Sequence, residues 1–179
     1  MIITVSGPPG SGKSTLARAL AEKLGYRYFY AGEIFRREAA ERGLTLEEFG
    51  RLAEKNWDID RRLDAMLVEE MKKAENTVFD ARLGGVLANV HGIQALKIYV
   101  TAEALERARR IAGREGLEIE KVMAEMLARE KSEAKRYAEI YGYDYTNREM
   151  YDLYIDSTRL SALEVLDLVM SHVEKIVRT

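Results

Sequence analysis

The 179-residue sequence contains no cysteine, only two histidines and only two prolines. Without cysteine the chain forms no disulfide and holds no metal through thiolates. The histidines, His91 and His172, lie far apart in the sequence, which disfavours a histidine-rich metal site. The prolines stand together at positions 8 and 9, so no proline-rich linker separates parts of the chain. These absences leave one compact domain whose chemistry depends on other side chains.

The sequence also lacks long apolar runs and an excess of charge of one sign. No segment approaches the roughly 20 apolar residues of a membrane span, and the N-terminus has no basic region or cleavage site typical of a secretory signal. The 28 Lys and Arg residues offset 30 Asp and Glu residues, for a net charge of −2. Such a balanced, charge-rich chain is globular and lacks the basic field of a nucleic-acid-binding protein. We therefore expect a cytoplasmic protein with no membrane and no nucleic-acid partner.

Short apolar segments rich in β-branched and aromatic residues alternate with helical segments along the chain. Strands are expected over 2–6, 26–30, 77–79, 95–101 and 153–155. Helices are expected over 13–24, over 32–75 with breaks near 43 and 56, and over 102–141. A final helix is expected after a cap at Ser161, through about residue 177. Thr45 with Glu48, and Ser161 with Glu164, predict two capping boxes. The alternation is typical of an α/β fold, with a five-stranded parallel sheet and helices on both faces.

A phosphate-binding pattern, G-x-x-x-x-G-K-[ST], is present between the first expected strand and helix. It reads Gly7-Pro8-Pro9-Gly10-Ser11-Gly12-Lys13-Ser14, and Thr15 follows it. Small residues let backbone N–H groups surround a polyphosphate, and the helix N-terminus adds donors and its dipole. Lys13 places a cation on the β- and γ-phosphates, and the Ser14 hydroxyl can ligate Mg²⁺. We therefore predict a P-loop NTPase fold that binds ATP through residues 7–15, with Mg²⁺ as cofactor; pattern and context together disfavour a plain glycine turn.

A P-loop establishes nucleotide binding but not a reaction. A GTPase needs a base-reading N-K-x-D segment, which this sequence lacks, and AAA-type or recombinase ATPases are usually larger, so a small kinase is favoured. The strand that ends in Asp80 supplies a carboxylate which, beside the P-loop strand, can hold Mg²⁺, often through water. An aspartate that caps the next helix is the alternative interpretation of Asp80.

Arginines in three groups suit phosphoryl transfer, which depends on positioning and charge stabilisation. They are Arg36–Arg37, Arg61–Arg62 and the segment from Arg129 to Arg136. In the last segment, positions 129, 133 and 136 share one helical face. Spacing alone favours a solvated helix face with ion pairs for this segment. For Arg107 and Arg110 two interpretations stay open: stacking on the donor base, or a solvated helix face.

Four segments, in this order along almost the whole chain, together resemble the cytidylate kinases of the nucleoside-monophosphate kinase group, most closely the short archaeal type. They are the P-loop with Thr15, Tyr30-Ala31-Gly32-Glu33-Ile34-Phe35-Arg36, Phe79-Asp80-Ala81-Arg82, and Arg129-x-x-x-Glu133-x-x-Arg136. The segment from Asp152 to Thr158 also resembles the last strand of the family. The family usually has Gly where Ala81 stands, and its bacterial members often have Ser where Ala31 stands.

The resemblance implies transfer of the γ-phosphoryl group of ATP to CMP or dCMP. The implied catalytic residues are Lys13, Arg129 and Arg136, with the two arginines closing on the phosphoryl group. The implied acceptor-binding residues are Arg36, Arg61 and Arg82 at the phosphate, Asp60 and Asp80 at the nucleoside or metal shell, and Glu133 orienting arginines or touching the acceptor. Asp80 and Ser14 are the implied metal ligands.

The resemblance also implies how the single domain is divided. A core is expected over about 1–30, 76–115 and 150–179, with a short helical acceptor-binding region over about 31–75 and a helical lid over about 116–145. We expect a monomer whose partners are the small molecules ATP and CMP or dCMP. The alternatives are another small P-loop kinase, for adenylate, uridylate or a shikimate-type acceptor, or a nucleotide-switch protein or ATPase.

Overall fold

The computed structural model describes residues 1–177, and the side chains of all of them except 46, 47 and 177. Its strands are β1 (Ile2–Ser6), β2 (Arg27–Tyr30), β3 (Thr77–Asp80), β4 (Leu96–Thr101) and β5 (Leu153–Asp156). They form one parallel sheet in the order β2-β3-β1-β4-β5. All five predicted strands are confirmed to within one residue at each end, and β3 lies beside β1 as predicted.

The helices of the described part are confirmed where the sequence predicted them, with one addition. They are α1 (Lys13–Leu24), α2 (Gly32–Glu41), α3 (Leu46–Lys55), α4 (Trp57–Lys73), α5 (Gly84–Val90), α6 (Ala104–Glu115), α7 (Ile119–Tyr141) and α8 (Ala162–Val177), besides the short 3₁₀ turn η1 (Arg148–Met150). Both predicted capping boxes are present, at Thr45 with Glu48 and at Ser161 with Glu164. The expected helical stretch 102–141 is two helices, because Gly116 ends α6 in a left-handed conformation.

Helix α5 was not predicted from the sequence. It begins with Gly84 and Gly85, which are poor helix formers. Burial favours it: residues 84–88 all lie in the core, and the N–H of Gly85 donates to Ser6 Oγ at 3.1 Å. Gly85 is required for this packing, since a Cβ atom there would lie 2.5 Å from the ring of Tyr151.

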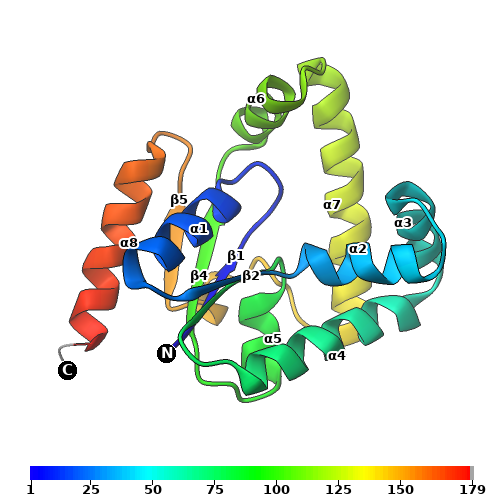
Figure 1. The fold of residues 1–179 in the computed structure, drawn as a ribbon. Helices are drawn as coiled ribbons and strands as arrows, with labels where there is room; N and C mark the ends of the chain where they lie inside the picture. Colours follow the sequence, from blue (N-terminus) through cyan, green and yellow to red (C-terminus); the bar gives the residue numbers. More distant parts are fainter. Residues whose placement is uncertain (178–179) are drawn as a thin grey trace.

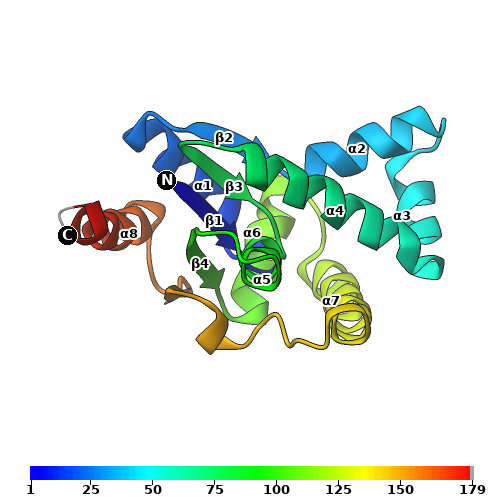
Figure 2. The same cartoon turned by 90° about the horizontal axis from the view of Figure 1, so that it is seen from below.

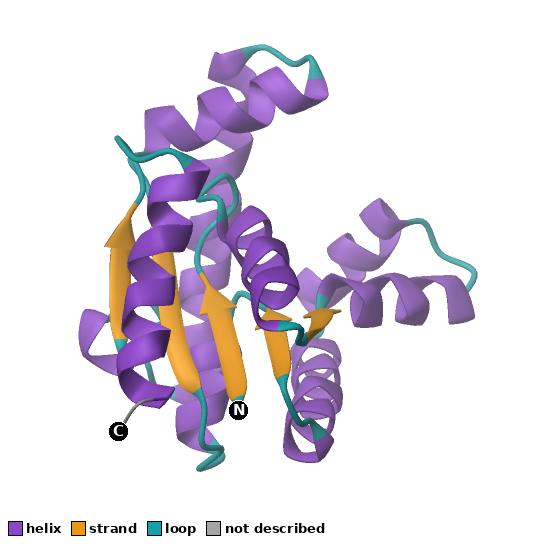
Figure 3. Ribbon diagram, turned by 60° about the vertical axis from the view of Figure 1, so that its left-hand side comes forward, coloured by secondary structure: helices purple, strands orange, loops and turns teal. Residues whose placement is uncertain are grey.

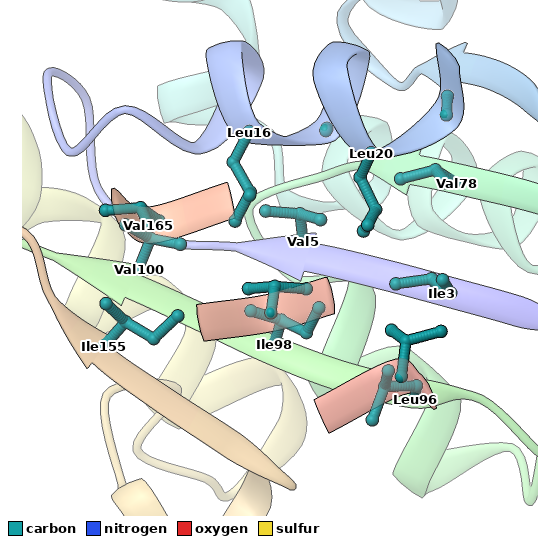
Figure 4. Close-up of a cluster of buried hydrophobic side chains, with 14 residues drawn as sticks. Ile3, Val5, Leu16, Leu20, Val78, Leu96, Ile98, Val100, Ile155 and Val165 are labelled. Atoms are coloured by element: carbon teal, nitrogen blue, oxygen red, sulfur yellow. The ribbon is translucent and has the colours of Figure 1, made fainter. Parts of the chain in front are cut away.

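Helices cover both faces of the sheet, as Figures 1 and 3 show. Side chains alternate between these faces along each strand. Ile3, Val5 and Ile98 point toward α1 and α8 and meet Leu16 and Leu20 there, as seen in Figure 4. On the other face, a second cluster packs β3 and β4 against α4 and α5; it includes Phe79, Tyr99, Leu67 and Leu87. The sheet is therefore buried on both sides, which explains the apolar strands.

Two helical groups extend beyond the sheet and have small cores of their own. In α2–α4, Ala39, Phe49, Ala53 and Ile59 pack together, and α6 and α7 pack around a second small cluster that includes Val122 and Met126. Figures 1 and 2 show α2–α4 and α7 on the side of α5, away from α8. Each group therefore has a small core of its own, while α4 also joins the second cluster on the sheet through Leu67.

The carboxyl ends of the strands bring the P-loop and Asp80 together. Val5 of β1 pairs with Asp80 of β3, and Ser6 pairs with Tyr99 of β4. The P-loop that follows β1 therefore lies between the ends of β3 and β4, where open parallel sheets bind ligands. Within residues 1–177 no helix has the length and apolarity to cross a membrane. Residues 178 and 179, included in the expected core, lie outside the described residues.

Candidate functional site

The P-loop packs tightly against β4 and α6. A Cβ atom on Gly7 would lie 2.1 Å from the carbonyl oxygen of Val100, and one on Gly10 would lie 2.6 Å from that of Arg107. Gly12, with a φ of +91°, has nothing within 4 Å of the same position. The first two glycines are thus required by packing, while Gly12 supplies a left-handed turn at the entry to α1 and leaves the space before the helix open to a ligand.

The first residues of α1 point donors and a cation toward that space. The N–H groups of Lys13, Ser14 and Thr15 precede the first bond of the helix, from Leu16 N to the Gly12 carbonyl at 3.0 Å, and so have no intrahelical acceptor. Burial lowers the pKa of Lys13, and the negative charge of Asp80 opposes that shift. This arrangement of free N–H groups and a lysine suits a polyphosphate.

Asp80 is fully buried beside the P-loop. Its Oδ2 atom accepts a hydrogen bond from the Tyr28 hydroxyl at 2.9 Å, while its buried Oδ1 atom has no hydrogen-bond partner. Burial, with the charge of Asp80, raises the pKa of Tyr28 to about 12, so Tyr28 stays a neutral donor. The alternative interpretation, a helix cap, is wrong, because the N-cap residue of α5 is Leu83. An unpaired carboxylate oxygen at this place suits a cation.

Ala81 occupies its position without strain. Among the described non-glycine residues only Asn76 has a positive φ, so the backbone at Ala81 needs no glycine. The Ala81 side chain is buried, and its N–H donates to the carbonyl of Val5 at 3.2 Å. Alanine in place of the family's usual Gly therefore does not strain the backbone between Asp80 and Arg82.

Arg82, Arg129 and Glu133 meet at one point. Glu133 is buried, with 4% of its surface exposed, and it forms ion pairs with Arg82 and with Arg129, the latter at 2.8 Å. Arg82 follows β3, whereas Arg129 and Glu133 lie one turn apart on α7. Burial lowers the pKa of Arg82. The ion pair expected along the helix face is therefore real, but a third partner from the sheet makes it a tertiary contact.

Arg136 and Asp60 form a second ion pair, at 2.9 Å, with only 11% and 13% of their side chains exposed. It joins α7 to α4. Burial raises the pKa of Asp60, and the positive charge of Arg136 opposes the rise. The structure thus pairs Asp60 directly with Arg136, a contact that the sequence did not predict.

Arg61 and Arg36 lie apart from these clusters. The Arg61 side chain is 59% exposed and pairs with Asp58 at 3.5 Å. Successive residues of a helix point about 100° apart, so Arg61 faces away when its neighbour Asp60 faces α7. Arg36 is exposed on α2, with its guanidinium 5.9 Å from the ring centre of Tyr30. The structure therefore does not bring Arg61 to the other predicted acceptor residues.

Arg107 and Arg110 both donate hydrogen bonds to carbonyl oxygens of the P-loop. The solvated-face interpretation is wrong for the buried Arg107, whereas Arg110 is partly exposed and lines a cavity beside the loop. Arg107 is buried; it donates to the carbonyls of Ala102 at 2.9 Å and Pro9 at 3.3 Å, and pairs with Glu130. Arg110 donates to the carbonyl oxygens of Gly10 at 3.4 Å and of Ser157 at 2.8 Å. The only sequence signal for these roles is the i, i+3 spacing of the two arginines.

Ser157 completes this support of the P-loop. Its hydroxyl donates to the Ser11 carbonyl at 2.9 Å and accepts from Arg110 at 3.0 Å. Beside it lies a cavity of about 200 Å³, lined by residues that include Gly12, Thr15 and Leu160. The residues after β5, α6, α8 and the P-loop thus border a space next to the phosphate-binding backbone.

These features define a class: a small P-loop kinase, with the loop at the carboxyl edge of a parallel sheet, a buried aspartate beside it and arginines from several elements. The shikimate kinase from Bacteroides thetaiotaomicron shares the fold, with a TM-score of 0.62 and 16% identity over 97% of this chain and 98% of that chain. At that identity the likeness concerns the fold alone.

The particular family is shown by sequence relatives. The model of the cytidylate kinase-like family matches residues 2–159. The cytidylate kinase of Methanothrix thermoacetophila is 43% identical over 176 residues, covering 98% of this chain and 99% of the relative. That of Methanopyrus kandleri is 41% identical over 183 residues, covering 98% and 94%. The chain therefore belongs to the cytidylate kinase-like family.

The hydroxyl of Tyr28 can be tested as the support of Asp80. Tyr28→Phe leaves both carboxylate oxygens of a buried aspartate without a hydrogen bond, which is costly. We expect the affinity for Mg²⁺–ATP, measured by calorimetry, to fall on the order of 10-fold. The matched control is Tyr26→Phe, which alters a tyrosine packed on the same apolar cluster. Equal affinity of the two variants would contradict the role.

Proposed function

We propose that the protein transfers the γ-phosphoryl group of ATP to CMP or dCMP, giving ADP and CDP or dCDP. The observation that carries the proposal is the meeting of Arg82 and Arg129, from separate elements, at the buried Glu133 near the P-loop. Two arginines gathered beside a phosphate-binding loop suit a reaction that moves negative charge between phosphates. Membership of the cytidylate kinase-like family supports cytidylate as the acceptor.

ATP is bound by residues 7–15 in this proposal. The free N–H groups at the start of α1 hold the phosphates, and Lys13 supplies a positive charge at the β- and γ-phosphates. The adenine lies in the cavity of about 200 Å³ beside Thr15, Arg110 and Ser157. The mixed lining of that cavity, with apolar side chains and an arginine, suits a flat heteroaromatic ring.

Mg²⁺ fits the residues at the mouth of the P-loop. Ser14 presents a hydroxyl at the start of α1, and Asp80 has a buried oxygen without a hydrogen-bond partner. Mg²⁺ in kinases takes one or two protein oxygens and completes its six ligands with waters and phosphates. When bound, the ion offsets negative charge on the phosphates during transfer. Ser14 and Asp80 are therefore the proposed protein partners of the ion, with Asp80 acting directly or through water.

The acceptor phosphate is bound by arginines in an acceptor region over about 31–75, together with Arg82. Arg36 is proposed for this role although its side chain is exposed here, because the lid and acceptor region must close over the substrates. Arg61 is left out of this role, because its side chain faces away from α7 and pairs with Asp58. Asp60 and Asp80 then contact the nucleoside or the metal shell.

The lid, over about 116–145, supplies Arg129 and Arg136 to the transferring phosphoryl group. Glu133 orients Arg129 and Arg82 until phosphate oxygens compete for the same guanidinium groups. No general base is needed, because the attacking acceptor oxygen is already an anionic phosphate oxygen. Closure excludes the water that would otherwise hydrolyse ATP. The protein is also proposed to be a monomer and to act in the cytoplasm, where its proposed nucleotide substrates are found.

A panel of acceptors tests the function. With ATP and Mg²⁺ in a coupled assay, we expect CMP and dCMP to be phosphorylated with the highest kcat/KM among all nucleoside monophosphates and shikimate. Preference for AMP, UMP or shikimate would mean that the protein is a different small kinase. Rapid ATP hydrolysis without any acceptor would instead favour an ATPase or a nucleotide switch.

Arg129 is expected to act in the chemical step. Arg129→Ala removes a charge that meets the phosphoryl group only on closure, so kcat should fall by roughly 100-fold or more, while the ATP dissociation constant changes little. Arg109→Ala, which removes an exposed arginine of α6, is the control and should leave kcat near the wild-type value. An unchanged kcat for Arg129→Ala would remove Arg129 from catalysis.

Arg36 is expected to bind the acceptor. Arg36→Ala should raise KM for CMP about 10-fold or more, the cost of losing a charged hydrogen bond to phosphate, and should affect KM for ATP less. Steady-state kinetics with each substrate varied in turn measures both. The neighbouring exposed Arg37→Ala is the control. Equal changes in both KM values would count against the assignment.

A further inference from the structure

A second polar contact joins α4 to α7, apart from the pair of Asp60 with Arg136. The hydroxyl of Tyr141 donates a hydrogen bond to the carboxylate of Asp64. Asp60 and Asp64 are one turn apart on α4, on the same face of that helix, and both contact side chains near the C-terminal end of α7. Figure 1 shows the yellow end of α7 reaching the level of α4, and the two helices are in contact.

The two contacts differ in whether they must break when the substrate binds. Arg136 and Asp60 are both proposed to meet substrate, so their ion pair must loosen when the substrate binds. Neither Asp64 nor Tyr141 has such a competing role, and their hydrogen bond can persist through the reaction. Arg136 also receives little other support: a 3.3 Å hydrogen bond to Ser132, within its own helix, and a contact with the ring of Tyr137.

We propose that Asp64 and Tyr141 are positioning residues, whose hydrogen bond holds the end of the lid helix α7 on the acceptor region and thereby places Arg136 over the acceptor. This inference rests on the proposed function for its effect on catalysis. The contact between the helices does not depend on that function.

The ionisation of Asp64 should tune this contact. Burial, together with the charge of Asp60, raises the pKa of Asp64 to about 7. The hydrogen bond from Tyr141 and the positive charge of Arg136 oppose this rise. Burial also raises the pKa values of Tyr137 and Tyr141, so both stay neutral.

The other elements packed on α4 add little charge near Asp64. Helix α5 carries no ionisable side chain. Helices α2 and α3 also pack on α4, and Glu38 of α2 is paired with Arg62 at 3.4 Å. Arg62 is two residues from Asp64, so it lies on nearly the opposite side of α4.

The sign of the pH effect follows from the raised pKa. A carboxyl group whose pKa is higher in the folded state stabilises that state fully at low pH, and loses this contribution as the pH rises through its folded pKa. Above about 7, Asp64 adds a second negative charge next to Asp60, and both carboxylates then depend on the positive charge of Arg136. The contact of α4 with α7 should therefore be firmer at pH 6 than at pH 8.

Hydrogen–deuterium exchange on the ligand-free protein tests the contact directly. Tyr141→Phe removes one hydroxyl and should speed exchange in the C-terminal half of α7, on the order of 10-fold for one lost hydrogen bond. The N-terminal half, packed on α6 through Val122 and Met126, should be unchanged. Tyr143→Phe, which alters a tyrosine 47% exposed just beyond α7, is the control. Unchanged exchange in Tyr141→Phe would overturn the contact.

Kinetics test the positioning role. Tyr141→Phe should raise KM for CMP and lower kcat, each by roughly 3- to 10-fold, with KM for ATP nearly unchanged. In the wild type, KM for CMP should rise as the pH passes about 7, and this rise should disappear in Asp64→Asn. The substrate phosphate itself titrates near 6, but identically for every variant, so the difference between the two pH profiles isolates Asp64.

If KM for CMP still rises above about pH 7 in Asp64→Asn, the positioning role is overturned. It is also overturned if Tyr141→Phe alters exchange but leaves the kinetics unchanged. If the wild type phosphorylates no acceptor of the panel, the proposed function has failed, and the exchange measurement alone decides the contact.

Discussion

The parallel pairing of β1 with β3 and β4 is the constraint on which the rest of the structure depends. It sets Val5 beside Asp80 and Ser6 beside Tyr99, so the P-loop emerges between the ends of two neighbouring strands. Every later feature uses this edge. Asp80 lies beside the loop, Arg82 follows two residues on, and the backbone of β4 packs so closely on Gly7 that no side chain fits there. A sheet with β1 at its edge would leave the loop with one neighbour.

Four arginines around this edge each have a carboxylate partner, and two of them share one. Arg82 and Arg129 share Glu133, Arg136 pairs with Asp60, and Arg107 pairs with Glu130. A buried charge without a partner is far more costly than a paired one, so a site built from several arginines needs carboxylates close by. The net charge of −2 therefore conceals local pairing. The paired arginines can still bind a substrate, because a phosphate can replace a carboxylate as their partner.

Much of the fold follows from local patterns. The five strands are short apolar runs, and the P-loop carries its own turn and helix start, so both were predictable from the residues alone. Helix α5 was not, because two glycines begin it and only burial against Ser6 and Tyr151 stabilises it. Arg61 shows a similar limit: Asp60 and Arg61 are both charged, so residue type alone does not reveal which of the two faces inward. The roles of Arg107 and Arg110, held by P-loop carbonyls, depend on contacts nearly 100 residues apart in the chain.

The sequence by itself determined the elements, the phosphate-binding loop, the carboxylate at the end of the third strand and the family resemblance, because each is written in residues close together along the chain. Only the tertiary structure decided which partners the charged side chains take across different elements. It joined Glu133 to Arg82, turned Arg61 to solvent, and set Asp64 against Tyr141 of another helix. Such pairings depend on which faces of the helices meet, and that is settled by the packing of the whole chain.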